Sequence, residues 1–223
     1  NGLPGNPISD KAGLYRATVK YGFSGKVTPS REGYSFDPPM RQYDNLLNDM
    51  ANEDYSATLK KQTISGNIIS DRGPVADAFV VADAGGGSVT TDASGRYELI
   101  VDYGWKGTVT PTKEGYTFTP ANKKYTSVTK DQTNEGYSAK VLTFNISGSV
   151  IIGGTPIEGV LVTASEGGGS ATTDNKGKYT IAVPYGWSGE VTPIKEGFNF
   201  NPPSQTYTCL LYTSPSPRDR QKS

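Results

Sequence analysis

The stretch that decides the fold occupies residues 91–120 and reads TDASGRYELIVDYGWKGTVTPTKEGYTFTP. Within it, Tyr97, Leu99 and Val101 recur at every second position. A period of two is typical of a strand with one buried face, since successive side chains of a strand point to opposite sides. Tyr116 and Phe118 repeat the pattern. The stretch therefore predicts consecutive short β-strands.

Turn signals separate these strands. In TDASGRY, Asp92 and Gly95 suit a tight turn, because aspartate bonds its own backbone and glycine accepts a positive φ. In PTKEGY, Gly115 closes a second turn. The chain has 27 glycines and 15 prolines, and such signals every 8–12 residues favour a β-sandwich. We expect strands near 62–70, 78–84, 87–91, 96–102, 107–112, 116–119, 123–128 and 135–141.

The same sequence motif occurs three times. YGWKGTVTPTKEGY begins at Tyr103, and close copies begin at Tyr21 and Tyr185, each 82 residues from the next. A fixed period of this length indicates tandem small domains rather than one large core. We predict the latter part of one repeat, one complete repeat and a third repeat without its last strand, at residues 1–60, 61–142 and 143–208.

The segment TDNKGKYTIAVPYGWSGEVTPIKEGF, together with the strand link at Pro156 and Ile157, resembles the carboxypeptidase regulatory-like domain. The resemblance implies an all-β fold of tandem Ig-like or prealbumin-like β-sandwiches. It also implies an extracellular setting without catalytic activity of its own. The second half of each repeat is similar to repeats of large bacterial surface and secreted proteins, where such units serve as spacers or accessory modules.

The repeat breaks off after Thr208, where CLLYTSPSPRDRQKS follows. Its first eleven residues resemble one reading frame of a transposon-type sequencing adapter. We therefore expect 209–223 to be non-native, as expression tags are.

Composition excludes several functions. Lys plus Arg and Asp plus Glu both total 22, so no basic face for nucleic acid is expected. No apolar run approaches the ~20 residues of a membrane span, and no membrane insertion is expected. Histidine is absent and Cys209 is the single cysteine, which excludes His-based nucleophile systems and Cys/His metal sites.

Recurring acidic residues are the candidates for chemistry. Glu32, Glu114 and Glu196 recur as catalytic carboxylates could, but no second carboxylate accompanies them at a fixed place. Asp92 and Asp174 offer too few oxygens for calcium, which needs about six ligands. We therefore expect solvated turn residues, no catalytic site, no metal and no cofactor.

Two other local patterns bear on crosslinking and on phosphate binding. A Lys–Asn isopeptide crosslink would join Lys61 to Asn134, but Thr143 occupies the lysine position in the next repeat. The GGGS loops lack the helix or lysine that phosphate binding requires. We expect neither feature to operate here.

Aromatic residues form the best binding candidate. Trp105 and Trp187, with Phe23 in the same slot, and the neighbouring Tyr103 and Tyr185 could stack on sugar rings at a sandwich end. The alternative is that these rings cap the core. Exposure of the tryptophans distinguishes the two hypotheses.

The sequence thus favours a non-catalytic structural spacer or adhesion module of a large bacterial surface or secreted protein. Its partners would be neighbouring domains of the same polypeptide, with polysaccharide or a cell-surface ligand as a further option. The alternative is a carbohydrate-binding accessory module of a secreted hydrolase. An enzyme in its own right ranks last, because no catalytic constellation is present.

Overall fold

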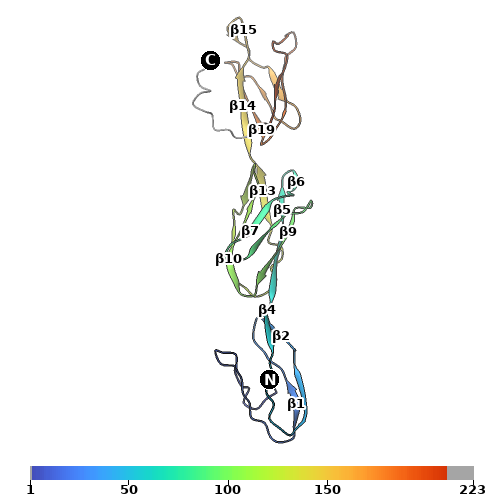
Figure 1. Cartoon of the computed structure of the whole chain (residues 1–223). Coiled ribbons are helices and arrows are strands. Elements are labelled where there is room, and N and C mark those ends of the chain that lie inside the picture. Colours follow the sequence, from blue (N-terminus) through green and yellow to red (C-terminus); the bar gives the residue numbers. More distant parts are fainter. Residues whose placement is uncertain (1, 210–223) are drawn as a thin grey trace.

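The computed structural model describes residues 2–209, and these form an all-β protein. Each sheet is confined to one of three stretches of chain, which follow one another along a line (Figure 1). We call these stretches the first (2–60), middle (61–142) and third (143–209) segments. Within the described residues there is no helix, and so none that could span a membrane.

The middle segment is a β-sandwich. One sheet has the order β12-β10-β7-β8, and the other has the order β11-β13-β5-β6 with β9 paired to β5. The strands are β5 (Lys61–Ser70), β6 (Gly73–Pro74), β7 (Phe79–Ala82), β8 (Gly87–Thr90), β9 (Arg96–Asp102), β10 (Trp105–Thr112), β11 (Tyr116–Thr119), β12 (Lys123–Val128) and β13 (Tyr137–Val141). The predicted strands are all present, within a few residues at their ends, and β6 was not predicted.

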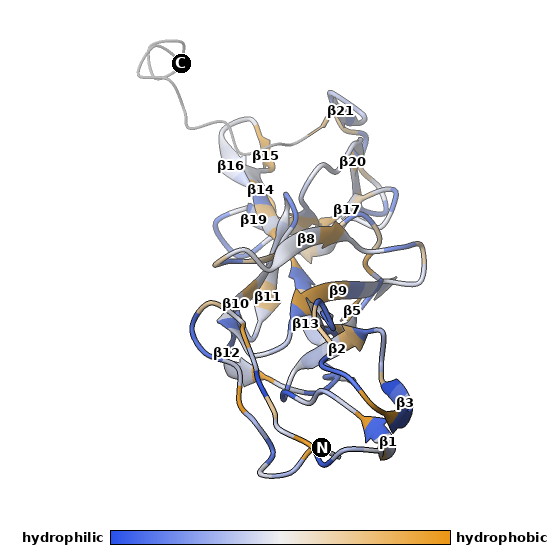
Figure 2. Cartoon of the chain, turned by 60° about the horizontal axis from the view of Figure 1, so that its bottom comes forward, coloured by the Kyte–Doolittle hydropathy of each residue, from blue (hydrophilic) through white to orange (hydrophobic). Residues whose placement is uncertain are grey.

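The core of the middle segment follows the period-two pattern. Along β9, Tyr97, Leu99 and Val101 are at most 2% exposed while their neighbours face solvent. Ile64 and Ile68 of β5 are completely buried against them. Figure 2 shows the apolar colour concentrated on strands such as β9 and β17, with hydrophilic loops around them. Burial of these side chains is the main force holding the two sheets together.

The first segment has four strands in two antiparallel pairs, and the third has eight. In the first segment β1 (Phe23–Val27) pairs with β3 (Arg41–Leu46), and β2 (Tyr34–Asp37) pairs with β4 (Ser56–Leu59). The third segment contains β14 (Thr143–Ser149), β15 (Ile151–Ile152), β16 (Thr155–Pro156), β17 (Leu161–Ala164), β18 (Ser170–Thr172), β19 (Lys178–Pro184), β20 (Gly189–Ile194) and β21 (Gln205–Tyr207).

Hydrogen bonds recur at the repeat spacing. Thr91 Oγ1 accepts from the Ala78 amide and donates to a carbonyl oxygen, and Thr173 Oγ1 does the same with Val160. The Asp92 turn was predicted and is present, since its carboxylate accepts from the amides of Ser94 and Arg96. The expected repeat boundaries themselves, and the tail that lies outside the described residues beyond Cys209, stay predictions.

Candidate functional site

A single residue links each segment to the next, and both of its backbone groups are hydrogen-bonded. The Leu142 amide donates to the Gly115 carbonyl oxygen of the middle segment at 2.8 Å, and its own carbonyl oxygen accepts from the Tyr185 amide of the third at 2.8 Å. Lys60 does the same between the first and middle segments, with Gly33 and Tyr103. These links leave little rotational freedom, because both peptide groups are held by different segments.

A tyrosine and a glutamate close each junction. The Tyr103 hydroxyl donates to Glu32 Oε1 at 2.5 Å, and the Tyr185 hydroxyl donates to Glu114 Oε1 in the same way. The tyrosine ring packs against the glycine that follows the glutamate. A Cβ on Gly115 would come within 2.4 Å of the Tyr185 ring, so only glycine permits this contact.

Electrostatics agree with this pairing. The hydrogen bond to Glu114 raises the pKa of Tyr185 to about 12, and the bond to Glu32 raises the pKa of Tyr103. A phenol beside a carboxylate keeps its proton more strongly, because a phenolate there would face a like charge. The phenol that closes each junction therefore stays neutral across the pH range of living cells.

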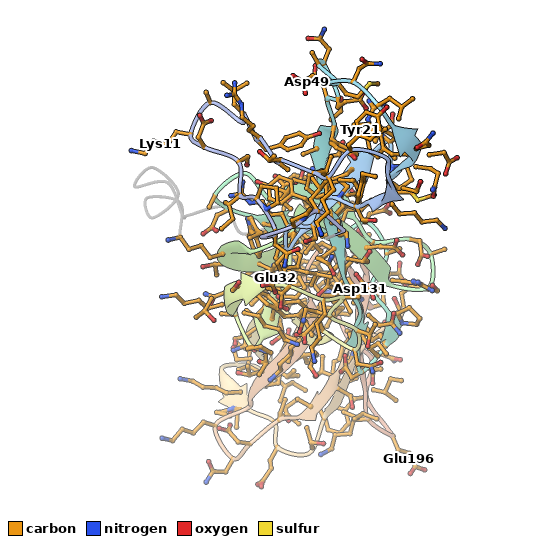
Figure 3. All side chains as sticks on the ribbon, turned by 90° about the horizontal axis from the view of Figure 1, so that it is seen from below. Lys11, Tyr21, Glu32, Asp49, Asp131 and Glu196 are labelled. Carbon is orange, nitrogen blue, oxygen red and sulfur yellow. The ribbon has the colours of Figure 1, made fainter. Side chains whose placement is uncertain are left out.

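Two residues have the same place in the repeat without such a partner among the described residues. Tyr21 is 82% exposed, and Glu196 is also exposed. They lie at opposite ends of the molecule (Figure 3). Gly197 is exposed, whereas Gly115 is buried beneath Tyr185. The comparison shows that the neighbouring segment buries the glycine of the turn, whereas the glutamate stays exposed in all three places.

The predicted stacking role does not fit the two tryptophans. Trp105 is 7% exposed and Trp187 is 4% exposed, and each indole Nε1 donates to a carbonyl oxygen, that of Asp83 or of Ser165. Neither tryptophan presents a ring face to a sugar. Their packing is that of residues that cap the core. Phe23 in the same slot is half-buried.

Tyr103 and Tyr185, the other predicted stacking residues, are half-buried and engaged in the junctions. A sugar would have to compete with the neighbouring segment for these rings. Sequence reasoning placed the tyrosines correctly at a sandwich end. It did not identify their partner.

A partly buried polar network recurs beside the last strand of the first and middle segments. In the middle segment Glu135 accepts from Lys123 and from the Tyr125 hydroxyl, both at 2.9 Å, and the Tyr97 hydroxyl donates to the Glu135 carbonyl oxygen at 2.5 Å. Burial opposes ionisation of Glu135, yet these two side-chain bonds outweigh it and lower its pKa. These hydrogen bonds fix the position of Glu135, which lies just before β13.

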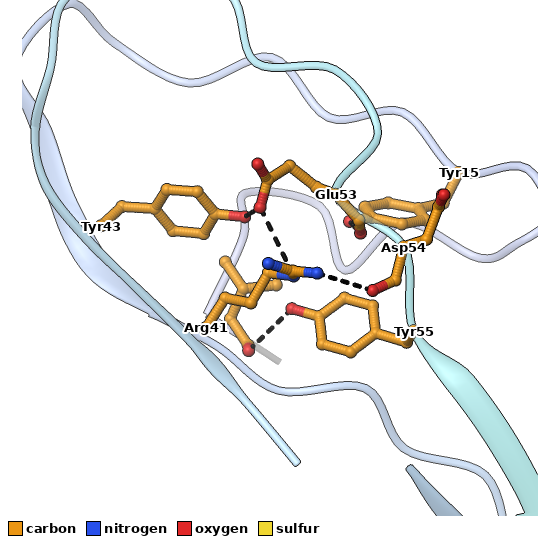
Figure 4. A network of polar contacts seen from close by, with 7 residues as sticks. Tyr15, Arg41, Tyr43, Glu53, Asp54 and Tyr55 are labelled. Atoms are coloured by element: carbon orange, nitrogen blue, oxygen red, sulfur yellow. Dashed lines mark hydrogen bonds and ion pairs between the residues drawn. The ribbon is translucent and has the colours of Figure 1, made fainter. Parts of the chain in front are cut away.

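The first segment builds the same arrangement from Arg41, Tyr43, Glu53 and Tyr15, as Figure 4 shows. Tyr43 donates to Glu53 at 2.8 Å, and the Arg41 guanidinium lies 3.4 Å from the same carboxylate. Burial raises the pKa of Tyr43, as it does that of Tyr125. Sequence analysis missed this network, although its members recur at the repeat spacing.

A shallow groove lies beside the Glu–Gly turns of the middle and first segments. In the middle segment it has a volume of 770 Å³ and its lining includes Phe79, Lys113, Glu114, Tyr116 and Phe118. The first segment has a groove of 450 Å³ with the corresponding residues Arg31, Glu32, Tyr34 and Phe36. In both, the cation lies over the tyrosine ring. Such a surface combines aromatic faces with charged groups.

The candidate crosslink and metal sites do not bring together, among the described residues, the groups that their chemistry requires. Lys61 is exposed and forms an ion pair with Asp102, which differs from the buried setting of a crosslink. Hydrogen bonds, the largest from Ser94, lower the pKa of Asp92, and a bond from the Lys178 amide lowers that of Asp174. Among residues 2–209 no three His, Cys, Asp or Glu side chains lie close enough to hold a metal.

The sequence comparison matches a known protein over only part of that protein's length. No family model matches the chain. Chitinase ChiA of Flavobacterium johnsoniae is 32% identical over 151 residues, which is 65% of this chain and 9% of the chitinase. The chain thus spans less than a tenth of that relative.

Solved structures support the fold. The TIE protein of Bacillus anthracis aligns with 92% of this chain and 42% of its own, with a TM-score of 0.65 and 15% identity. A streptococcal ancillary pilin covers 76% of this chain and 65% of its own at 11% identity, but its TM-score of 0.33 carries no argument. The chain is therefore an Ig-like type of β-sandwich protein by fold, and the finer resemblance to the carboxypeptidase regulatory-like family stays a prediction.

Proposed function

We propose that the chain is a non-catalytic spacer of tandem β-sandwich repeats in a bacterial surface or secreted protein. The single observation that carries this proposal is the doubly hydrogen-bonded link at Lys60 and at Leu142. A link of one residue with both peptide groups held transmits orientation from one segment to the next, as a flexible linker does not. Partners of such a spacer are the domains at its two ends.

Small-angle X-ray scattering tests the proposal. We expect the chain to scatter as a rod, and the double variant Glu32→Ala/Glu114→Ala to show a broader distribution of intramolecular distances, because the junction tyrosines lose their acceptors. Glu196→Ala is the matched control, since it removes the same residue where no described neighbour contacts it. Scattering of the unmodified chain as independently tumbling segments would contradict the proposal.

A second candidate is a carbohydrate-binding accessory module of a secreted hydrolase. Two observations favour it, namely the groove that recurs in two segments and the similarity to part of a chitinase. Phe79, 48% exposed at the rim of the larger groove, offers an aromatic face for the C–H groups of a sugar.

A pull-down on chitin, cellulose and xylan separates the two candidates. Retention that falls with Phe79→Ala but not with Leu161→Ala, the corresponding residue of the third segment, supports carbohydrate binding. Passage through all three polysaccharides without retention leaves the spacer function.

A further inference from the structure

The groove of the middle segment is lined by a carboxylate and by an open aromatic ring. Phe79 and Thr112 are cross-strand partners of β7 and β10, and both side chains are exposed, that of Phe79 to 48%. Asp77, which is also exposed, lies just before β7 and lines the same groove, together with Tyr116 and Phe118 of β11. A ligand in this groove would therefore meet an acid and an aromatic face at once.

The backbone conformation of Asp77 favours glycine over aspartate. Its φ is 53°, in the left-handed region, and the corresponding residue of the third segment is Gly159, with a φ of 72°. The two amides donate to the carbonyl oxygens of Thr91 and Thr173, both at 3.0 Å, so the local backbone is the same in both segments. Glycine adopts this conformation freely, whereas a residue with a Cβ is strained in it. The turn itself therefore does not explain the aspartate.

The carboxylate of Asp77 makes no contact that holds the segment together. Among residues 2–209 it has neither a hydrogen-bond partner nor an ion-pair partner. The lysine of the groove is occupied elsewhere, since Lys113 Nζ donates to the Ala76 carbonyl oxygen at 2.6 Å and lies 6.0 Å from the centre of the Tyr116 ring. Lys195 makes the same two kinds of contact in the third segment, where no aspartate is present. Asp77 is thus available to a ligand.

The chemistry of the groove selects a cationic sugar. Its acids, Asp77 and Glu114, outnumber its single base, Lys113, and this excess attracts a positive group. Phe79 offers a face for the C–H groups of a pyranose ring. An extended peptide would need free backbone groups at a sheet edge, but β7 and β10 are interior strands of their sheet. An amino sugar needs no such edge, because its amine and its ring face make the contacts.

We propose that this groove binds the protonated amino sugars of a polysaccharide, with the ammonium group paired to Asp77 and a pyranose ring stacked on Phe79. The third segment has Gly159 and Leu161 at these two positions, and so it offers neither contact. This proposal rests on the second candidate function and specifies the class of sugar.

Isothermal titration calorimetry of the full chain with two sugars tests the proposal. The probes are the hexamers of β-1,4-linked glucosamine and of N-acetylglucosamine, which present the same ring faces but differ in the charge on nitrogen. At mildly acidic pH and low salt we expect the glucosamine hexamer to bind roughly tenfold more tightly, as a charge-assisted hydrogen bond predicts. Added salt should reduce this preference, because it screens an exposed ion pair.

Three variants assign the preference to its residues. Asp77→Asn should abolish it, because asparagine tolerates the left-handed conformation but carries no charge. Asp71→Asn is the matched control for net charge, since Asp71 is an exposed acid of the same segment outside the groove lining, and it should leave the preference unchanged. Phe79→Leu, which introduces the residue of the third segment, should weaken binding of both hexamers several-fold. Asp77→Gly should not lower the melting temperature, because glycine suits this backbone.

The outcomes separate this proposal from carbohydrate binding in general. Equal affinity for the two hexamers, with both weakened by Phe79→Leu, would overturn the amino-sugar site and sustain the accessory function. Binding of neither hexamer would overturn the site, and the pull-down on polysaccharides then decides the accessory function by itself. Equal effects of Asp77→Asn and Asp71→Asn would assign the preference to net charge and also overturn the site. So would a lysine-rich peptide that binds through Asp77 when the glucosamine hexamer does not, which would identify a protein partner instead.

Discussion

The middle and third segments share one sequence pattern, but within residues 2–209 only the middle one of these two has a strand in the position of β13. Both have the β7- or β17-type strand at the centre of one sheet, a buried tryptophan and a threonine bonded to two backbone groups. The middle segment has β13 and the Glu135 network in addition. The core of the middle segment accordingly includes buried Tyr97, Tyr137 and Ala139, whereas Tyr179 is only partly covered. The last strand therefore completes one wall of the sandwich without determining the other.

The middle and third segments can be measured separately because each of these two contains one tryptophan. Trp187→Phe leaves Trp105 to report on the middle segment, and Trp105→Phe leaves Trp187 to report on the third. Phenylalanine already occupies this slot as Phe23. Urea unfolding followed by tryptophan fluorescence in these two backgrounds gives a free energy of unfolding for each segment.

The largest difference is expected for alanine in place of the strand glycine. Gly66→Ala should destabilise the middle segment by about 3 kcal/mol, because its Cβ would overlap the Glu135 backbone, which cannot move away cheaply. Gly148→Ala should cost the third segment less than about 1 kcal/mol, because the Tyr179 hydroxyl end can swing aside. Equal losses in the two segments would contradict the idea that an added strand covers only one of these glycines.

Sequence reasoning predicted the parts of this fold that depend on neighbours in the chain. The Asp92 turn, the period of two in β9 and the strand order in the sequence follow from local backbone preferences. The Tyr103–Glu32 and Tyr185–Glu114 pairs could not be predicted in this way, because 71 residues separate the partners and each pair joins two different segments. The recurrence of both residues on turns was the available signal, and it was assigned to solvated turns.

The tryptophans show a second limit. A residue bracketed by glycines at a strand end suits both an exposed platform and a lid on the core. Whether the indole is exposed or covers the core depends on the loop after β7. The Asp83 carbonyl oxygen of this loop accepts a hydrogen bond from Trp105 Nε1 at 3.2 Å. No local pattern specifies that contact.

An equal effect in both segments is expected for the buried threonines. Thr91→Val and Thr173→Val should each cost about 2 kcal/mol, because each leaves a buried amide and a buried carbonyl oxygen without a partner. These residues belong to the wall that the segments share. Urea midpoints in the two tryptophan backgrounds check this, and a loss confined to the middle segment would show that the shared wall depends on the last strand.

Alkaline pH should affect the middle segment more. Burial raises the pKa of Tyr97, Tyr125 and Tyr137, the last to about 12, whereas among the described residues of the third segment burial is the main cause of a raised pKa for Tyr207 alone. The junction phenols Tyr103 and Tyr185, whose pKa values are raised mainly by their glutamates, number one in each of the two segments, so they do not change the comparison. Neutral phenols stabilise the folded state fully below about pH 10, and this stabilisation is lost as pH rises, because the unfolded chain releases its protons first.

Between pH 9 and 11 the middle segment should therefore lose about 1.4 kcal/mol more than the third, the equivalent of one pKa unit of one group. Urea unfolding at the two pH values measures this difference. Parallel losses would mean that the phenols of the middle segment titrate as freely as those of the third.

The smallest difference is expected from a single hydroxyl. Tyr97→Phe removes the bond to the Glu135 carbonyl oxygen and should destabilise the middle segment by about 1 kcal/mol. Tyr179→Phe should leave the third segment unchanged within error, since the strand that would supply the acceptor is not among the described residues there. Urea unfolding in the two tryptophan backgrounds measures both losses. Equal losses in the two segments would contradict the assignment of the stabilising bond to the Glu135 carbonyl oxygen, because that acceptor belongs to the middle segment alone.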